Sequence, residues 1–175
     1  LSGMCKSCIC IFFIVIINFF MLGLSVKDCD MLINYGIGGS GKSTMFNMLS
    51  STLAFYTQTI KFTAFNDNNE FQMCFRNLPS YVRMIFIEEC DKIKTLSNLK
   101  MLCDGKIAMR VKRENKTEIM SISAKVFTTT NNFIYFGEDT GLLRRINYLS
   151  YESQFIPASE GAEDANNFVF HRDVH

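Results

Sequence analysis

Apolar and polar positions along the middle of the chain form blocks that predict strands and helices in turn. Runs that are apolar or alternate with period two predict β-strands, and one run with apolar residues at helical spacing predicts a helix. Strands interleaved with helical segments indicate an α/β fold in which helices flank a mostly parallel sheet, with functional loops at the carboxyl ends of the strands. The predicted strands are residues 31–35, 59–65, 82–89, 124–132 and 145–151, and the predicted helix is 43–56.

Both ends of the chain depart from this alternation. Residues 8–24 form an apolar run broken only by Asn18, slightly shorter than a segment that spans a bilayer. Three interpretations of residues 1–29 stay open: a fragment or a start placed upstream of the true one, a signal peptide or membrane anchor, and a buried helix of the fold. Residues 156–175 are mostly polar and aperiodic, so we expect a loose tail there and a folded domain over residues 30–155.

Composition restricts function less than the pattern does. The chain of 175 residues is 48% hydrophobic, which supports one domain with a real core, and its net charge of +1 gives no global case for nucleic acid or membrane. Seven cysteines at irregular spacing indicate a reducing compartment rather than a disulfide framework. Cys5, Cys8 and Cys10 lie close together, but His171 and His175 are at the far end of the chain, so we expect no zinc site.

A glycine-rich stretch, INYGIGGSGKSTMF at residues 33–46, lies between the first predicted strand and the predicted helix. It fits the phosphate-loop (Walker A) pattern GxxxxGK[ST], whose glycines let successive backbone N–H groups turn toward phosphate oxygens. Lys42 is expected to reach the β- and γ-phosphates of ATP, and Ser43 to bind Mg2+. The residues predicted to bind ATP are Gly36, Gly38, Gly39, Ser40, Gly41, Lys42, Ser43 and Thr44.

Two adjacent acids, Glu88 and Glu89, end the predicted strand 82–89. A phosphate loop requires carboxylates that hold magnesium and polarise the attacking water, and neighbouring acids can divide these tasks. We therefore expect both acids to be catalytic (Walker B), with Glu88 also a metal ligand. On these two residues alone, a solvated charge pair at a strand end is the alternative.

Residues 100–122 contain a turn at Gly105 followed by alternating residues, which predicts a β-hairpin with a cationic tip. Such a ribbon suits the phosphates of a single strand, because it offers charge without a base-edge code. A solvated surface hairpin is the alternative. The cations of the hairpin are Lys106, Arg110, Lys112, Arg113 and Lys116.

Amides and arginines flank the last two predicted strands. Asn131 and Asn132 end one strand, and Arg144 and Arg145 begin the next. An amide in this position can contact the γ-phosphate or the attacking water, and an arginine can stabilise charge on the transferred phosphoryl group, often in a neighbouring subunit.

The order of these motifs resembles that of the superfamily 3 helicases of DNA viruses. The stretches IFIEECDK, KMLCDGKIAMRVKRENKTEI and VFTTTNN are most similar to the helicase domain of parvovirus and densovirus nonstructural proteins, and the papillomavirus replicative helicase is a more distant likeness. The resemblance covers residues 30–155. It implies an AAA+ type core that assembles into a hexameric ring, hydrolyses ATP with Mg2+, and moves 3′ to 5′ on single-stranded DNA at a replication fork in the host nucleus.

The resemblance also implies a role for each matching residue. Glu114 stands where the family usually has a second basic residue, which weakens the implied DNA contact unless Arg113 or Lys116 substitutes for it. Two other functions stay open: an inactive relic that binds nucleotide or DNA without unwinding, and another P-loop ATPase or a small-molecule kinase. The implied catalytic residues are Lys42, Glu88, Glu89, Asn131 as sensor and Arg145 as arginine finger (Arg144 matches less well), and the implied DNA-binding residues are Lys100, Lys112, Arg113 and Lys116.

Overall fold

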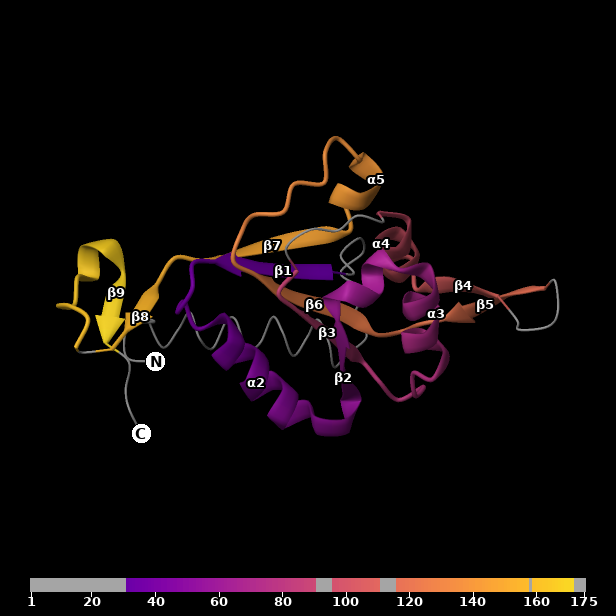
Figure 1. The fold of residues 1–175 in the computed structure, drawn as a ribbon, viewed down its shortest axis with the longest axis horizontal. Helices are drawn as coiled ribbons and strands as arrows, with labels where there is room; N and C mark the ends of the chain where they lie inside the picture. Colours follow the sequence, from indigo (N-terminus) through magenta and orange to yellow (C-terminus); the bar gives the residue numbers. More distant parts are fainter. Residues whose placement is uncertain (1–30, 91–95, 111–115, 158, 172–175) are drawn as a thin grey trace.

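A five-stranded sheet forms the centre of the computed structural model, which describes residues 31–90, 96–110, 116–157 and 159–171. The strand order is β2-β3-β6-β1-β7, and every neighbouring pair is parallel (Figure 1). The predicted α/β class with a mostly parallel sheet is therefore confirmed. The strands are β1 (Met31–Gly36), β2 (Thr57–Lys61), β3 (Met84–Glu88), β6 (Lys125–Thr130) and β7 (Ile146–Tyr151).

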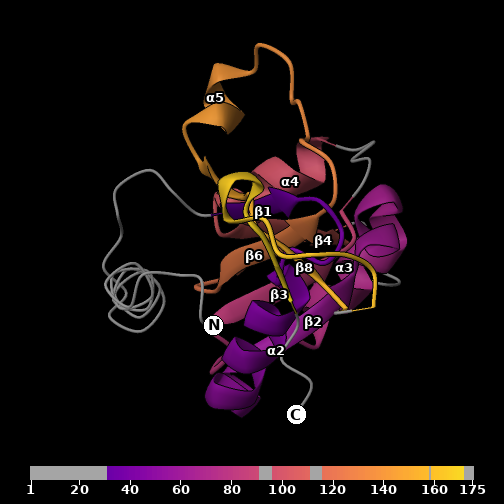
Figure 2. The ribbon, with the colours of Figure 1, turned by 90° about the vertical axis from the view of Figure 1, so that its left-hand side faces the viewer.

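Helices cover both faces of this sheet, as Figures 1 and 2 show from two directions. Helix α2 (Lys42–Leu53) lies on one face, and the 3-10 turn η1 (Ala54–Tyr56) follows it. Helices α3 (Asn68–Arg76) and α4 (Leu96–Cys103) pack on the opposite face. A short helix, α5 (Thr140–Leu143), precedes β7. The result is a three-layer arrangement in which the loops after β1, β3 and β6 share one edge.

Aromatic packing holds α2 against its face of the sheet. The ring of Phe46 on α2 lies 4.1 Å from that of Phe86 on β3 and 6.5 Å from that of Phe127 on β6, measured between centroids. All three side chains are buried. Since β1 leads into α2 through residues 37–41, this packing places the N-terminus of α2 at the carboxyl edge of the sheet.

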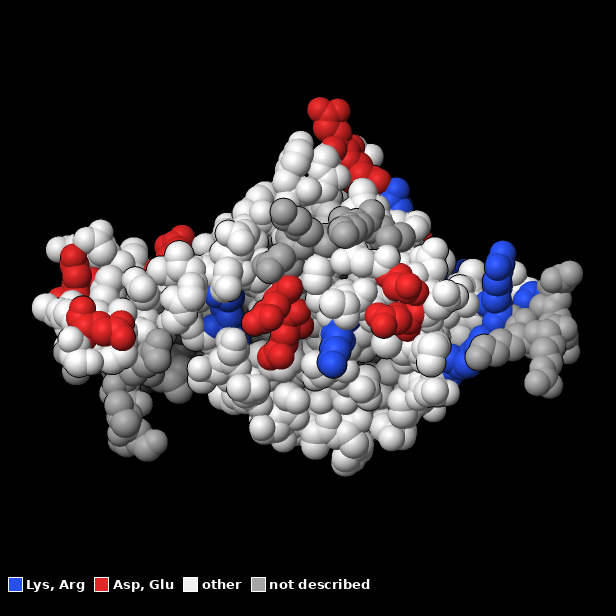
Figure 3. Space-filling model, in the orientation of Figure 1, with Lys and Arg blue, Asp and Glu red and all other residues white. Residues whose placement is uncertain are grey.

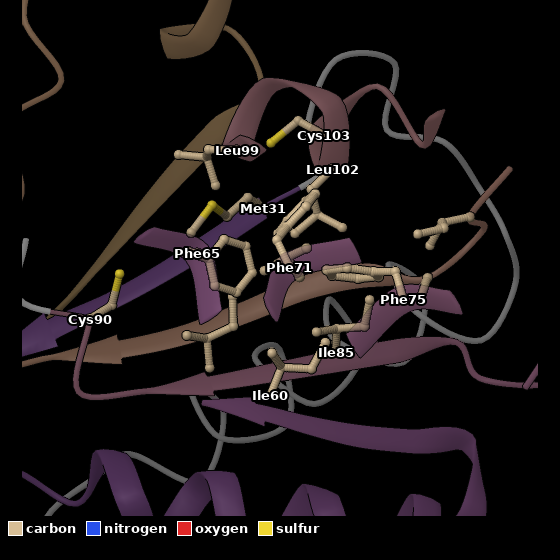
Figure 4. Packing of buried hydrophobic residues seen from close by; sticks show 14 of the residues in the cluster. Met31, Ile60, Phe65, Phe71, Phe75, Ile85, Cys90, Leu99, Leu102 and Cys103 are labelled. Carbon is tan, nitrogen blue, oxygen red and sulfur yellow. The ribbon is translucent and has the colours of Figure 1, made fainter. Parts of the chain in front are cut away.

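The opposite face carries the larger core, shown in Figure 4. Phe71 and Phe75 share one face of α3, and the ring of Phe65 lies 5.4 Å from Phe71 and 6.4 Å from Phe75. Phe65 belongs to the 3-10 helix η2 (Phe62–Asn66) and not to a strand. The predicted strand over 59–65 is therefore wrong beyond the end of β2, because the tight turn of η2 buries Phe65 against these rings.

The predicted β-hairpin is confirmed. Strands β4 (Lys106–Arg110) and β5 (Thr117–Ser121) pair antiparallel, and Ile107 is fully buried on the inner side of β4. The hairpin is also tied to α3, because Arg76 donates a hydrogen bond from Nη2 to the carbonyl oxygen of Arg110 at 2.6 Å. The base of the hairpin is thus part of the core, and β4 and β5 extend together away from the central sheet (Figure 1).

The C-terminal segment differs from the loose tail expected for residues 156–175. Strand β8 (Gln154–Ile156) pairs in parallel with β9 (Val169–His171), after the 3-10 turn η3 (Ala165–Asn167). Pairing of the apolar residues of the two strands, with Phe155 opposite Phe170, explains why this part of the chain is ordered in spite of its polar composition. Residues 172–175 lie outside the described residues.

Residues 1–29, with the apolar N-terminal run, also lie outside the described residues. The three interpretations of this segment therefore stay open. Within the described ranges, no helix is long and apolar enough to cross a membrane.

Candidate functional site

The loop between β1 and α2 has the backbone geometry of an anion-binding nest. Gly39 and Gly41 have φ values of 78° and 86°, whereas Ser40 between them is not in the positive-φ region. Alternation of this kind turns successive N–H groups toward one concave side of the chain, where they can surround an anion. The structure therefore places the predicted phosphate loop in a conformation that suits phosphate oxygens.

Lys42 lies at the centre of this loop. Its Nζ atom donates to the carbonyl oxygens of Gly36 at 2.6 Å and Ile37 at 2.9 Å, and contacts Ser40 Oγ at 3.0 Å. Three acceptors satisfy the three donors of the ammonium group, which is why this charge is tolerated in a buried position. Burial lowers the pKa of Lys42 below its ordinary value. The ammonium group is thus held against the backbone of the loop itself.

The first turn of α2 is open to an anion. Gly41 occupies the N-cap position without a side-chain cap, and the first turn contains no acidic residue. Helix α3 differs in both respects. Its N-cap residue Asp67 accepts hydrogen bonds from the backbone N–H groups of Asn69 and Glu70, and Glu70 is an acidic residue in its first turn. Uncapped N–H groups at the positive end of a helix dipole favour phosphate binding.

Glu88 and Glu89 are both exposed at the end of β3, at the edge of the sheet that carries the phosphate loop. Glu89 has a φ of 53°, a left-handed conformation that costs a residue with a Cβ about 1–3 kcal/mol. The backbone N–H of Cys90 donates to the carbonyl oxygen of Thr129 on β6 at 3.0 Å, and this bond holds the strained turn in place. The chain therefore leaves the strand conformation at Glu89, directly after Glu88 ends β3.

Asn131 is exposed directly after β6, the strand between β1 and β3. An aromatic cluster fixes the chain that follows it: the ring of Phe133 stacks on Tyr148 at 4.8 Å and meets the edge of Tyr35 at 5.3 Å. The hydroxyl of Tyr148 also donates to the carbonyl oxygen of Ile134 at 2.9 Å. Asn131 thus lies on the strand between those that lead to the phosphate loop and to the acids, and aromatic contacts hold the chain that follows it.

Two ion pairs join α4 and the base of the hairpin to the segment around α5. Lys100 Nζ lies 2.5 Å from Asp139 Oδ2, and Arg145 Nη2 lies 2.5 Å from Asp104 Oδ1. The hydrogen bond from Lys100 is the main cause that lowers the pKa of Asp139, which also caps α5 by accepting from the backbone N–H of Leu142. Lys100 is therefore engaged with a carboxylate in this structure, although it is predicted to bind DNA.

Arg145 and Arg144 have different surroundings. The Arg145 side chain is only 18% exposed, and it donates to the carbonyl oxygen of Gly141 in addition to its ion pair with Asp104. Arg144 is exposed, and within the described part of the chain its side chain makes no hydrogen bond or ion pair. Arg145 would have to leave its partners before it could reach a neighbouring subunit.

Basic residues gather at the end of the molecule that carries the hairpin, as Figure 3 shows. Lys106 and Arg110 are exposed on β4, and exposed Lys116 precedes β5, with its Nζ atom 3.8 Å from Glu118 Oε1. Lys112 and Arg113, the other predicted DNA-binding residues, lie outside the described residues, as does Glu114.

Sequence reasoning missed three residues that contact the predicted site residues. Asp104 and Asp139 hold Arg145 and Lys100, and nothing in their spacing along the chain indicates these pairs. Phe155 lies against the phosphate loop through a backbone hydrogen bond to Gly39. The short apolar run QFI was a signal for a strand at this point, but its partner lies more than ten residues away.

The parallel sheet, the loop after β1 and the acids at the end of β3 form an α/β core consistent with that of a P-loop NTPase. No family model matches the chain, and no curated protein matches its sequence. Solved structures do match: one is the apo A form of the C-terminal region of NrS-1, at a TM-score of 0.50 and 17% identity over 78% of this chain. The chain spans 32% of the length of that structure, and at this identity the likeness shows the fold alone.

Proposed function

We propose that this chain is an ATP-dependent DNA helicase domain of the viral replication type, which couples ATP hydrolysis to movement on single-stranded DNA and to unwinding. The observation that carries the proposal is the phosphate loop, in which backbone conformations alternate around Ser40 and the Lys42 ammonium group lies against the same residues. The basic hairpin beside the same core favours DNA as the second ligand.

Two exposed oxygen donors fit Mg2+ at this edge of the sheet. Ser43 lies on the first turn of α2, and Glu88 ends β3. Hydroxyl and carboxylate oxygens are ligands that Mg2+ accepts together with phosphates and waters. Bound there, Mg2+ would neutralise the charge of the β- and γ-phosphates.

The remaining residues divide the hydrolytic step. Glu89 would accept a proton from the attacking water, and Asn131 would orient that water or the γ-phosphate. Arg145 would complete the site of a neighbouring copy in a hexameric ring, once it has left Asp104. Arg144 is more exposed than Arg145. Both arginines are therefore candidates for the arginine finger.

The hairpin would follow the DNA backbone. Lys112, Arg113 and Lys116 supply charge at or near its tip, and phosphate contacts of this type give affinity without sequence preference. Lys100 would join them only after it releases Asp139. The site of action would be a replication fork in the host nucleus.

Separate titrations with the two ligands test this proposal. A fluorescent ATP analogue with Mg2+ and a labelled single-stranded oligonucleotide are each titrated against the wild type, Lys42→Ala and Lys112→Ala. We expect Lys42→Ala to weaken nucleotide binding at least about tenfold and leave DNA binding intact, because the ammonium group faces only the loop. Lys112→Ala should show the reverse. Nucleotide binding without any DNA binding would favour a kinase, and a wild type that binds neither would contradict the proposal.

A further inference from the structure

The C-terminal segment lies against the outer side of the phosphate loop. The backbone N–H of Phe155 on β8 donates to the carbonyl oxygen of Gly39 at 2.9 Å. No peptide bond among the described residues is cis, so the carbonyl group of Gly39 and the N–H group of Ser40 point in opposite directions. The bond from Phe155 therefore fixes the orientation of this peptide group, with the Ser40 N–H group directed away from β8.

Strand β8 can make this bond because its other side is occupied by β9. The backbone N–H of Gln154 donates to the carbonyl oxygen of Phe168 at 2.8 Å, and β8 pairs with β9 in parallel. Successive N–H groups of a strand point to opposite sides, so the N–H of Phe155 points away from β9. The phosphate loop thus accepts a hydrogen bond from one edge of β8, while the other edge of β8 pairs with β9.

Two glycines of the phosphate loop are in close contact with other segments, Gly36 with the end of β7 and Gly41 with β8. A Cβ atom on Gly36 would lie 2.4 Å from the carbonyl oxygen of Tyr151, and one on Gly41 would lie 3.5 Å from the ring of Phe155. Gly36 therefore permits the end of β7 to pass beside the loop, in addition to its place in the phosphate-binding pattern. The ring of Phe155 in turn lies 6.1 Å from that of Phe170 on β9.

We propose that the β8–β9 unit is a positioning element of the nucleotide site, which holds the phosphate loop in its anion-binding conformation through the N–H group of Phe155. This inference rests on the proposed binding of ATP by that loop. It assigns a function to strands β8 and β9, and it makes Phe155 a positioning residue that acts through Gly39 and Ser40 rather than by touching the nucleotide.

Replacement of the donor tests the inference. Phe155→Pro removes the N–H group, and proline is tolerated on the edge of a strand that faces away from its partner. Phe155→Leu keeps both the N–H group and an apolar side chain, so it is the matched control. We expect Phe155→Pro to weaken binding of the fluorescent Mg-ATP analogue about tenfold, and Phe155→Leu to bind like the wild type within about twofold.

Hydrogen exchange in the nucleotide-free protein gives a second readout, which does not depend on ATP binding. Backbone amides of residues 37–43 should exchange faster in Phe155→Pro than in Phe155→Leu, while exchange in β1 and β3 stays unchanged. Equal exchange of the loop in both variants would overturn the inference. Faster exchange combined with a wild type that binds no nucleotide would leave the positioning role intact and contradict the proposed function instead.

A variant remote from the loop covers the case in which Phe155→Pro fails to fold, as judged by circular dichroism. Phe170→Ala removes the ring that supports Phe155 and leaves the phosphate loop itself unchanged. We expect a loss of nucleotide affinity of about threefold and faster loop exchange, because β8 loses part of its support. Wild-type affinity and exchange in Phe170→Ala would overturn the inference.

Discussion

Glu89 is a residue whose backbone conformation conflicts with its side chain. Its φ of 53° suits glycine, yet the position carries a carboxylate at the end of β3. Strained residues of this kind persist where the surrounding structure holds them, and they concentrate at functional sites. The sequence indicated an acid pair at this position, but it could not show that one member leaves the strand in a left-handed turn.

Glu89→Gly should raise the stability of the protein and abolish its ATP turnover. We expect the free energy of unfolding to rise by about 0.5 kcal/mol, because relief of strain exceeds the entropy that glycine loses on folding. ATP turnover should be abolished, because the proposed base is gone. Denaturant unfolding beside an ATPase assay measures both quantities, with Glu89→Gln as the control that removes the base and keeps the Cβ atom. A Glu89→Gly variant with normal turnover would contradict the assignment of this residue.

The two ion pairs around α4 and α5 are contacts between elements that could not be predicted from the sequence. Strands and the hairpin follow from periodicity, which is why most of them could be predicted. Contacts such as Lys100 with Asp139 depend on how α4 and α5 lie in space, and no local pattern encodes that. The strand predicted over 59–65 is correct only as far as Lys61, for a related reason, because burial of Phe65 against α3 overrode its alternation.

Lys100→Met should raise the pKa of Asp139 toward its ordinary value, since the hydrogen bond from Lys100 is the main cause of its lowering. A carboxyl pKa that is lowered in the folded state stabilises the fold above the pKa of the unfolded chain. This contribution is lost as the pH falls through the lowered value. Carboxyl chemical shifts followed by NMR between pH 2 and 6, roughly the range in which carboxylates titrate, give the pKa in both proteins. An unchanged Asp139 pKa in the variant would show that the ion pair does not form in solution.

Substitutions at two nearby positions of the cationic hairpin, Lys116 and Glu118, should change DNA affinity in opposite directions. Lys116→Ala should weaken binding of single-stranded DNA and reduce the slope of log affinity against log salt by about one, because one phosphate contact is lost. Glu118→Gln should strengthen binding, since it removes the carboxylate that lies 3.8 Å from the Lys116 ammonium group. Anisotropy titrations at several salt concentrations measure both effects. Equal affinities for the two variants would indicate that this hairpin does not contact DNA.

At the scale of the whole molecule, the site is assembled from segments that are distant in sequence. The candidate residues of the phosphate loop, Glu88, Asn131 and the hairpin could be selected from the sequence because each belongs to a local motif. The contact of β8 with the phosphate loop could not, because its hydrogen bond to Gly39 uses a backbone N–H group that every residue except proline possesses. The sequence therefore predicted the chemical groups of the site better than the segments that hold them.

The central claim is that nucleotide hydrolysis and DNA binding are coupled in this chain. The most direct test is the steady-state ATPase rate of the full chain with and without single-stranded DNA, beside Lys42→Ala and Lys112→Ala. We predict that DNA stimulates the wild type several-fold, that Lys42→Ala has no turnover, and that Lys112→Ala keeps the basal rate but loses the stimulation. Absence of turnover in the wild type, or a rate indifferent to both DNA and Lys112, would contradict the claim.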